Sequence, residues 1–141
     1  MKISILLPYK ENFSPNYPGA VSLFVSDTCL LSKYKKNIIV YGSTDFKKKF
    51  LINYQNISLN KKKITSQSKE YIEKFIQYEK LKPSDLIEIH NRPNYLKFLD
   101  KKLNKRNYTL FFHNDPLSMD GSKSIFERKY LLKTCYRIIF N

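Results

Sequence analysis

The sequence is poor in the residues that build metal and redox sites. It contains two cysteines and two histidines in 141 residues. Cys29 and Cys135 lie in apolar helical contexts without a metal-binding or redox spacing, so we expect two free thiols in a reducing compartment. No third histidine or cysteine and no close group of carboxylates accompanies the histidines, so no metal ligand set is expected.

A long hydrophobic run is also missing. The apolar stretch after Met1 and Lys2 ends at Pro8, which makes it too short for a signal peptide or a membrane span. We therefore expect a cytoplasmic protein. Any contact with a membrane would be peripheral, on the inner face of the cytoplasmic membrane.

Acidic residues are scarce relative to basic ones. The chain has 26 lysines and arginines against 12 aspartates and glutamates, a net charge of +14. Such a charge fits a nucleic-acid or anionic membrane partner. However, lysine supplies most of it, and the abundant Lys, Asn, Ile, Tyr and Phe share A/T-rich codons, so coding bias explains the excess equally well. The lysine triplets at residues 47–49 and 61–63 are interpreted first as solvated faces, and nucleic acid is not the expected partner.

The residues that are present alternate between apolar strands and helical patterns. A length of 141 residues with 42% hydrophobic content is typical of one globular domain, residues 1–141. The alternation predicts an α/β fold: a Rossmann-like, mostly parallel sheet of about six strands with helices on both faces. The expected strands are residues 3–7, 37–41, 56–59, 85–89, 108–112 and 137–140.

Helical periodicity predicts four covering helices. They are expected after Gly19, at residues 66–80, from Pro93 to about residue 105, and after Ser124, where Glu127 completes a capping-box sequence. The residues expected on their buried sides are Val21, Phe24, Val25, Thr28 and Leu31 in the first, Ile72, Phe75 and Ile76 in the second, Leu96, Leu99 and Leu103 in the third, and Ile125, Leu131, Leu132 and Cys135 in the fourth.

Two of the expected strands end in the same polar pattern. Each is an apolar run, residues 85–89 and 108–112, followed by His-Asn and then, two residues later, by a proline. Ligands of open α/β sheets bind at the carboxyl ends of the strands, so these clusters are the main functional lead. We expect both histidines to lie at the same edge of the sheet as Gly19. The cluster residues are His90, Asn91 and Arg92, and His113, Asn114 and Asp115.

Two positions are candidates for contact with an anion. Gly19 and Ala20 open the first helix, where a small residue lets a phosphate reach the free amides of the helix N-terminus. Because the GxGxxG pattern is missing, a classical NAD site is not expected, and Gly19 is equally well explained as a turn glycine. The Arg92 guanidinium suits phosphate or carboxylate, or else it pairs with Glu88 or Asp115. Without a GxSxG elbow, Ser-His-Asp chemistry is poorly supported.

Together these motifs resemble the N-terminal domain of glycosyltransferase family 4, a retaining family with the GT-B fold. The similarity is greatest to its bacterial members that build lipopolysaccharide and other surface polysaccharides. It covers essentially the whole chain. It rests on the Gly19-Ala20 helix start, His90-Asn-Arg-Pro93, His113-Asn-Asp-Pro116, Ser122-Lys-Ser124 with Glu127-Arg128, and Ile138-Ile-Phe-Asn141.

The resemblance implies transfer of a sugar from a nucleotide-sugar to a lipid-linked or polysaccharide acceptor, with no metal and no other cofactor. It implies that His113 is a catalytic histidine beside the transferred sugar. Gly19 and Ala20 would lie near the donor phosphates. The other implied substrate-binding residues are His90, Asn91, Arg92, Asn114 and Asp115.

Nothing in residues 1–141 corresponds to the donor-binding domain of that family. We therefore expect the chain to be inactive alone and to need a donor domain, in the same protein or in a separate chain. Two alternatives stay open: a non-catalytic partner that regulates a complete transferase, and a basic nucleic-acid-binding α/β protein.

Overall fold

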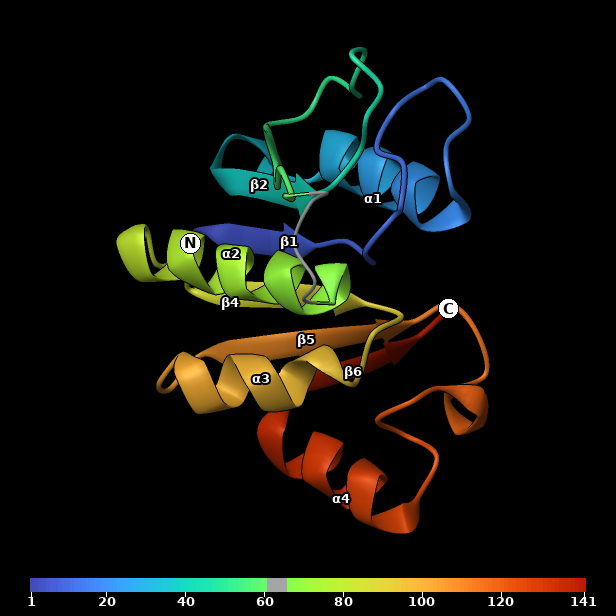
Figure 1. Ribbon diagram of the computed structural model, residues 1–141, viewed down its shortest axis with the longest axis vertical. Coiled ribbons are helices and arrows are strands. Elements are labelled where there is room, and N and C mark those ends of the chain that lie inside the picture. The colour runs from blue at the N-terminus through green and yellow to red at the C-terminus, as the bar shows by residue number, and fades with distance from the viewer. Residues whose placement is uncertain (61–65) are drawn as a thin grey trace.

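A computed structural model describes residues 1–60 and 66–141 (Figure 1). The described residues form one sheet with six parallel strands, together with four α-helices, a Rossmann-like α/β arrangement that confirms the predicted fold class. The strands are β1 Ile3–Leu6, β2 Ile38–Gly42, β3 Tyr54–Asn56, β4 Leu86–His90, β5 Asn107–Phe112 and β6 Arg137–Phe140. Their order across the sheet is β3-β2-β1-β4-β5-β6. The direction of winding reverses between β1 and β4, and such reversals create ligand crevices at the carboxyl edge.

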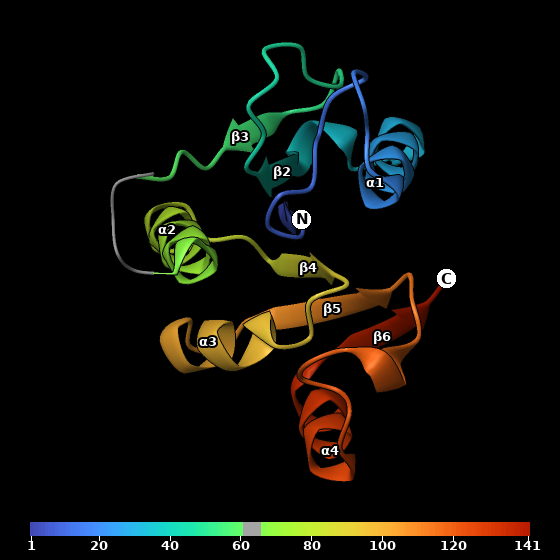
Figure 2. The ribbon, with the colours of Figure 1, turned by 45° about the vertical axis from the view of Figure 1, so that its right-hand side comes forward.

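The helices cover the two faces of the sheet unequally (Figure 2). Helix α1, Ala20–Leu31, lies on one face, whereas α2, Gln67–Leu81, α3, Tyr95–Lys102, and α4, Ile125–Thr134, lie on the other. Right-handed crossovers require this division, because the chain moves outward from β1 to β2 in one direction and from β3 to β6 in the other. The prediction of helices on both faces is confirmed.

The apolar side chains of the strands separate into two cores. On the α1 side, Ile3, Ile5 and Val40 pack with Val21 and Val25 of the helix. The larger core lies under α2, α3 and α4 and contains the residues predicted to be buried in α2 and α3: Ile72, Phe75, Ile76, Leu96, Leu99 and Leu103. None of the helices in the described part of the chain has the length and apolarity needed to cross a membrane.

Strand β3 lies earlier in the chain than predicted. Residues 56–59 were expected, but the strand is Tyr54–Asn56, which pairs in register with Val40 to Gly42 of β2. The apolar residue Ile57 is buried just after the strand, where its N–H donates to the Gly42 carbonyl at 2.7 Å. Ile57 is thus buried without belonging to the strand, which explains why the apolar pattern predicted a strand at residues 56–59.

Helix α3 begins two residues later than predicted. Asn91 has a left-handed backbone with φ of +50°, and the Tyr95 N–H closes a turn on the Arg92 carbonyl at 3.0 Å. Pro93 therefore lies in this turn and precedes the helix. The helix also ends earlier, at Lys102 instead of about residue 105.

The buried stripes of α1 and α4 are also different from the predicted ones. In α1, Ser22 and Ser26 join the valines on the buried side, and Leu31 is exposed together with Thr28. In α4, which covers the sheet edge at β6, only Leu131 of the predicted group is buried; Ile125 and Leu132 are exposed and Cys135 is half-buried. Both cysteines are free thiols, and burial raises the pKa of each to about 12.

Candidate functional site

The carboxyl ends of β4 and β5 bring the two histidines into direct contact. His90 is the last residue of β4, and His113 follows directly after β5. Nδ1 of His90 lies 2.9 Å from Nε2 of His113, and the rings are stacked with their centroids 5.2 Å apart. The prediction that both histidines share one edge of the sheet is confirmed.

Aromatic side chains enclose this pair. The Phe111 ring stacks on His90 at 4.7 Å, and Phe24 of α1 meets His113 edge-on at 4.9 Å. His90 is only 1% exposed, whereas His113 keeps part of its surface open to solvent. Desolvation, and then the neighbouring His90, lower the pKa of His113 below its usual 6.5, so that its ring is uncharged at neutral pH.

Asn91 fastens the two strand ends to each other. Its N–H donates to the Phe111 carbonyl at 2.9 Å, and its side-chain oxygen accepts from the His113 N–H at 2.8 Å. Asparagine tolerates the left-handed backbone that this position needs. Asn91 therefore sets the position of the His113 backbone, a contact that sequence reasoning did not anticipate.

The other residues of the two clusters lie around the histidines with local partners. Arg92 donates from Nη1 to the Asn91 carbonyl at 2.7 Å, and no described residue forms the predicted ion pair with it. The Asp115 carboxylate accepts from the Leu117 N–H at 3.0 Å and caps a short 3₁₀ helix, Pro116–Ser118. Asn114 is exposed beside it. Their roles in ligand binding stay predictions.

At Gly121 the loop after β5 packs closely against the backbone that follows β4. Gly121 has φ of +97°, and a Cβ there would lie 2.5 Å from the Asn94 backbone nitrogen. Next to it, the buried Ser122 hydroxyl lies within hydrogen-bond distance of the Pro116 and Met119 carbonyls. These contacts hold residues 116–122 together. The loop that carries Asn114 and Asp115 is consequently fixed against the one that carries Arg92.

The N-terminus of α1 is occupied by a carboxylate of the chain itself. Oε1 of Glu11 accepts from the Ser22 N–H at 3.0 Å. A Cβ on Gly19 would lie 1.9 Å from the same oxygen, so the glycine makes room for Glu11. A phosphate at Gly19 and Ala20 would compete with Glu11 for this amide. Sequence reasoning missed Glu11 because it lies within a long loop whose course no motif indicates.

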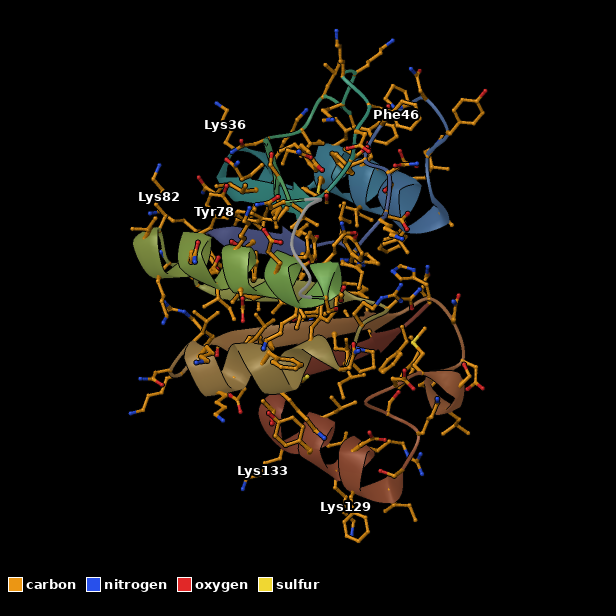
Figure 3. The ribbon with its side chains drawn as sticks, viewed as in Figure 1. Lys36, Phe46, Tyr78, Lys82, Lys129 and Lys133 are labelled. Atoms are coloured by element: carbon orange, nitrogen blue, oxygen red, sulfur yellow. The ribbon has the colours of Figure 1, made fainter. Side chains whose placement is uncertain are left out.

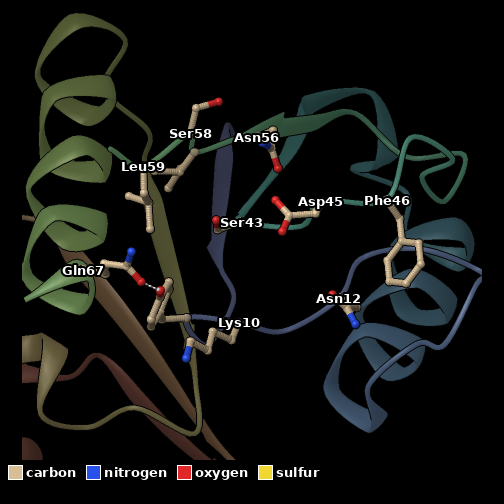
Figure 4. A pocket seen from close by; sticks show the side chains of 11 residues that line it. Lys10, Asn12, Ser43, Asp45, Phe46, Asn56, Ser58, Leu59 and Gln67 are labelled. Atoms are coloured by element: carbon tan, nitrogen blue, oxygen red, sulfur yellow. Dashed lines mark hydrogen bonds between the residues drawn. The ribbon is translucent and has the colours of Figure 1, made fainter. Parts of the chain in front are cut away.

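A polar cleft opens over the carboxyl ends of β1, β2 and β3, at the same edge of the sheet as the histidines (Figure 4). Its volume is about 660 Å³. Loops after the three strands and the first residue of α2 supply amides, a carboxylate, an amine and aromatic rings around the open space. The residues that define it best are Tyr9, Lys10, Asn12, Asp45, Phe46 and Asn56, with Gln67 accepting from the Tyr9 hydroxyl. Such a mixture suits a ligand rich in hydroxyl groups.

No family model matches this chain, and no curated protein and no solved structure matches it either. Within residues 1–60 and 66–141 there is no group of three or more His, Cys, Asp or Glu side chains placed to hold a metal ion. A Rossmann-like sheet supports many chemistries, so function has to be argued from the histidine pair and the cleft.

Proposed function

We propose that this chain is the acceptor-side domain of a retaining glycosyltransferase that moves a sugar from a nucleotide-sugar to a lipid-linked or polysaccharide acceptor. The observation that carries the proposal is the contact between His90 and His113 at the carboxyl edge of the sheet. The contact lies beside α1, which supplies Phe24, and at the same edge of the sheet as a polar cleft large enough for a sugar. These features give the site a rigid hydrogen-bonding group and a binding volume at one edge.

The cleft is the proposed place of the acceptor. Amide, carboxylate and amine groups pair with the hydroxyls of a sugar, while the Tyr9 and Phe46 rings offer apolar faces. Because the lining residues come from separate loops, the cleft also has several points at which acceptor specificity is set.

His113 is the proposed contact to the transferred sugar. Asn91 fixes its backbone and His90 fixes its ring, so its imidazole is held in place before the substrate arrives. A preorganised group of this kind contributes most when its partner changes charge in the transition state, here as the bond to the diphosphate breaks. The donor-binding half of the site would come from a further domain or a separate chain.

The distribution of lysines favours this proposal over nucleic-acid binding. Lys36 lies in a short 3₁₀ helix before β2 and Lys82 directly after α2, whereas Lys129 and Lys133 lie on α4 at the other end of the molecule (Figure 3). A nucleic-acid-binding protein of this charge typically gathers its basic residues on one face or stripe.

The test uses the chain together with a donor domain. His113→Ala is expected to lower kcat about 10²–10³-fold, because loss of one preorganised contact costs roughly 2.7–4 kcal/mol. KM for the acceptor is expected to change much less. Lys133→Ala, on the exposed side of α4, is the matched control and should leave both constants unchanged. A lower melting temperature of His113→Ala with unchanged kcat per folded molecule would contradict the assigned role.

A second arm needs no partner. The isolated chain is expected to bind its acceptor glycan weakly and to leave a nucleotide-sugar intact. Asn12→Ala with Asp45→Ala should abolish the glycan binding if the cleft is the acceptor site. Sustained hydrolysis of the donor by the chain alone would exclude a half-site.

A further inference from the structure

Three ionisable side chains form a row across the carboxyl end of the sheet. Glu88 and His90 are alternate residues of β4, so their side chains leave the same face of the sheet. Oε2 of Glu88 lies 3.8 Å from Nε2 of His90, and Nδ1 of His90 lies 2.9 Å from Nε2 of His113. Beyond His113, the amide nitrogen of Asn141 lies 3.4 Å from its Nδ1.

The buried end of the row decides which ring nitrogens carry hydrogen. Nε2 of His90 is buried and has no hydrogen-bond partner among the described residues, and the carboxylate of Glu88 is the charge that faces it. A lone pair on Nε2 would face this negative charge, whereas an N–H there is attracted to it. Hydrogen therefore belongs on Nε2 of His90.

The hydrogen on Nε2 of His90 also determines the tautomer of His113. A neutral imidazole carries one hydrogen, so Nδ1 of His90 is left with a lone pair. Nε2 of His113 must then donate to that lone pair across the 2.9 Å contact, and Nδ1 of His113 becomes an acceptor. The Asn141 amide nitrogen, a donor, lies on that acceptor side and agrees with this direction. The lowered pKa of His113 favours the neutral ring on which the assignment depends.

We infer that Glu88 and His90 are positioning residues, which hold His113 in the tautomer with hydrogen on Nε2 and an acceptor lone pair on Nδ1. The partner that His113 takes at Nδ1 is consequently a donor, such as a hydroxyl group, and a phosphate oxygen does not fit there. That this hydroxyl belongs to a sugar rests on the proposed function. The tautomer itself does not.

Nitrogen NMR on the intact chain tests the inference without any ligand. The two histidines are the only ones in the sequence, so correlations between ring nitrogens and ring carbon-bound protons are readily assigned. At a pH at which both rings are uncharged, each is expected to show hydrogen on Nε2 alone. Hydrogen on Nδ1 of His113, or a mixture of tautomers, would overturn the proposal.

Glu88→Gln tests the source of the effect. Glutamine keeps the size of the side chain, but its amide can donate to Nε2 of His90 and so lets the row reverse. We expect hydrogen to move to Nδ1 of His113 in a large share of the molecules. Asp85→Asn is the matched control: it removes a carboxylate just before β4 that contacts the N-terminus and Lys2 instead of the histidines, and it should leave the tautomer unchanged.

The remaining outcomes are also decisive. An unchanged His113 tautomer in Glu88→Gln, or an equal shift in Asp85→Asn, would remove Glu88 from the role. If Glu88→Gln does not fold, His90→Phe replaces it: the phenyl ring keeps the packing on Phe111 but accepts no hydrogen bond, so His113 should lose its single tautomer. A failed transferase assay would leave these results standing, and a failed tautomer test would leave the proposed function standing.

Discussion

Two buried polar networks lie at opposite ends of the sheet, and they are built differently. At the amino end, Glu79 of α2 is fully buried and accepts from the Ser4 hydroxyl and from both the N–H and the hydroxyl of Ser84. At the carboxyl end, His90 is equally buried, but only one of its ring nitrogens has a hydrogen-bond partner among the described residues, and that partner, His113, is partly exposed.

The difference separates a structural network from a candidate functional one. The carboxylate of Glu79 is surrounded by donors and joins α2 to β1 and to the start of β4, so it leaves nothing for a ligand. The histidine row ends in Nδ1 of His113, near solvent, where the exposed Asn141 amide at 3.4 Å is a partner that a ligand hydroxyl could replace. Completeness of hydrogen bonding, more than burial, is therefore the feature that distinguishes the two ends.

The largest effect is expected from breaking the amino-end network. Glu79→Leu leaves the donors of Ser4 and Ser84 without an acceptor, and each unsatisfied buried group costs about 1–3 kcal/mol. Three donors lose their acceptor, so we expect the free energy of unfolding to fall by at least about 3 kcal/mol in urea titrations. Glu73→Leu, on the exposed side of the same helix, is the control and should change it by less than about 0.5 kcal/mol. Equal losses of unfolding free energy in Glu79→Leu and Glu73→Leu would mean that the hydrogen bonds of Glu79 do not stabilise the fold.

A smaller effect is expected at the carboxyl end, and it depends on pH. The pKa of His113 is lower in the folded chain than its usual 6.5, so below 6.5 the unfolded chain binds more protons. Stability contributed by this ring is therefore complete above 6.5 and is lost as the pH falls through the lowered folded pKa. Urea unfolding at a series of pH values should show this loss in the wild type and in Glu79→Leu, but not in His113→Gln. A wild-type profile that coincides with that of His113→Gln would show that the ring has no linkage to folding.

Much of the fold could be predicted because its physical causes are local. Apolar runs alternating with helical patterns predicted the parallel sheet, and in α2 a single stripe of Ile72, Phe75 and Ile76 predicted the buried side. In α1 the same reasoning predicted the buried Val21 and Val25 but missed Ser22 and Ser26, because these buried positions are small and polar and leave no hydrophobic signal.

The site was predicted in the same uneven way. Parallel strands end at a shared edge, so His90 and His113 could be placed together from their positions after two apolar runs. The cleft could not be predicted, because Asn12 and Asp45 come from loops and Asn56 from the end of β3, without a common motif. Their meeting depends on chain paths that only the folded structure specifies.

The smallest effect is expected at a third polar contact, where Glu11 meets the N-terminus of α1. The carboxylate accepts from the Ser22 N–H at 3.0 Å, and its charge interacts favourably with the helix dipole. Glu11→Gln keeps an acceptor oxygen and loses the charge, so unfolding free energy should fall by about 0.3–1 kcal/mol. Asp27→Asn, an exposed change farther along α1, is the control and should have a smaller effect.

The same variant also tests whether the N-terminus of α1 serves the fold alone, like the Glu79 network, or can bind a ligand, like the histidine row. Removal of the charge at Glu11 lessens the competition for the amides beside Gly19 and Ala20. If these residues approach a phosphate, as the family resemblance implies, inorganic phosphate should raise the melting temperature of Glu11→Gln more than that of the wild type. If phosphate leaves the melting temperatures of both chains unchanged, the role of Gly19 is to make room for Glu11. The N-terminus of α1 would then, like Glu79, serve the fold alone.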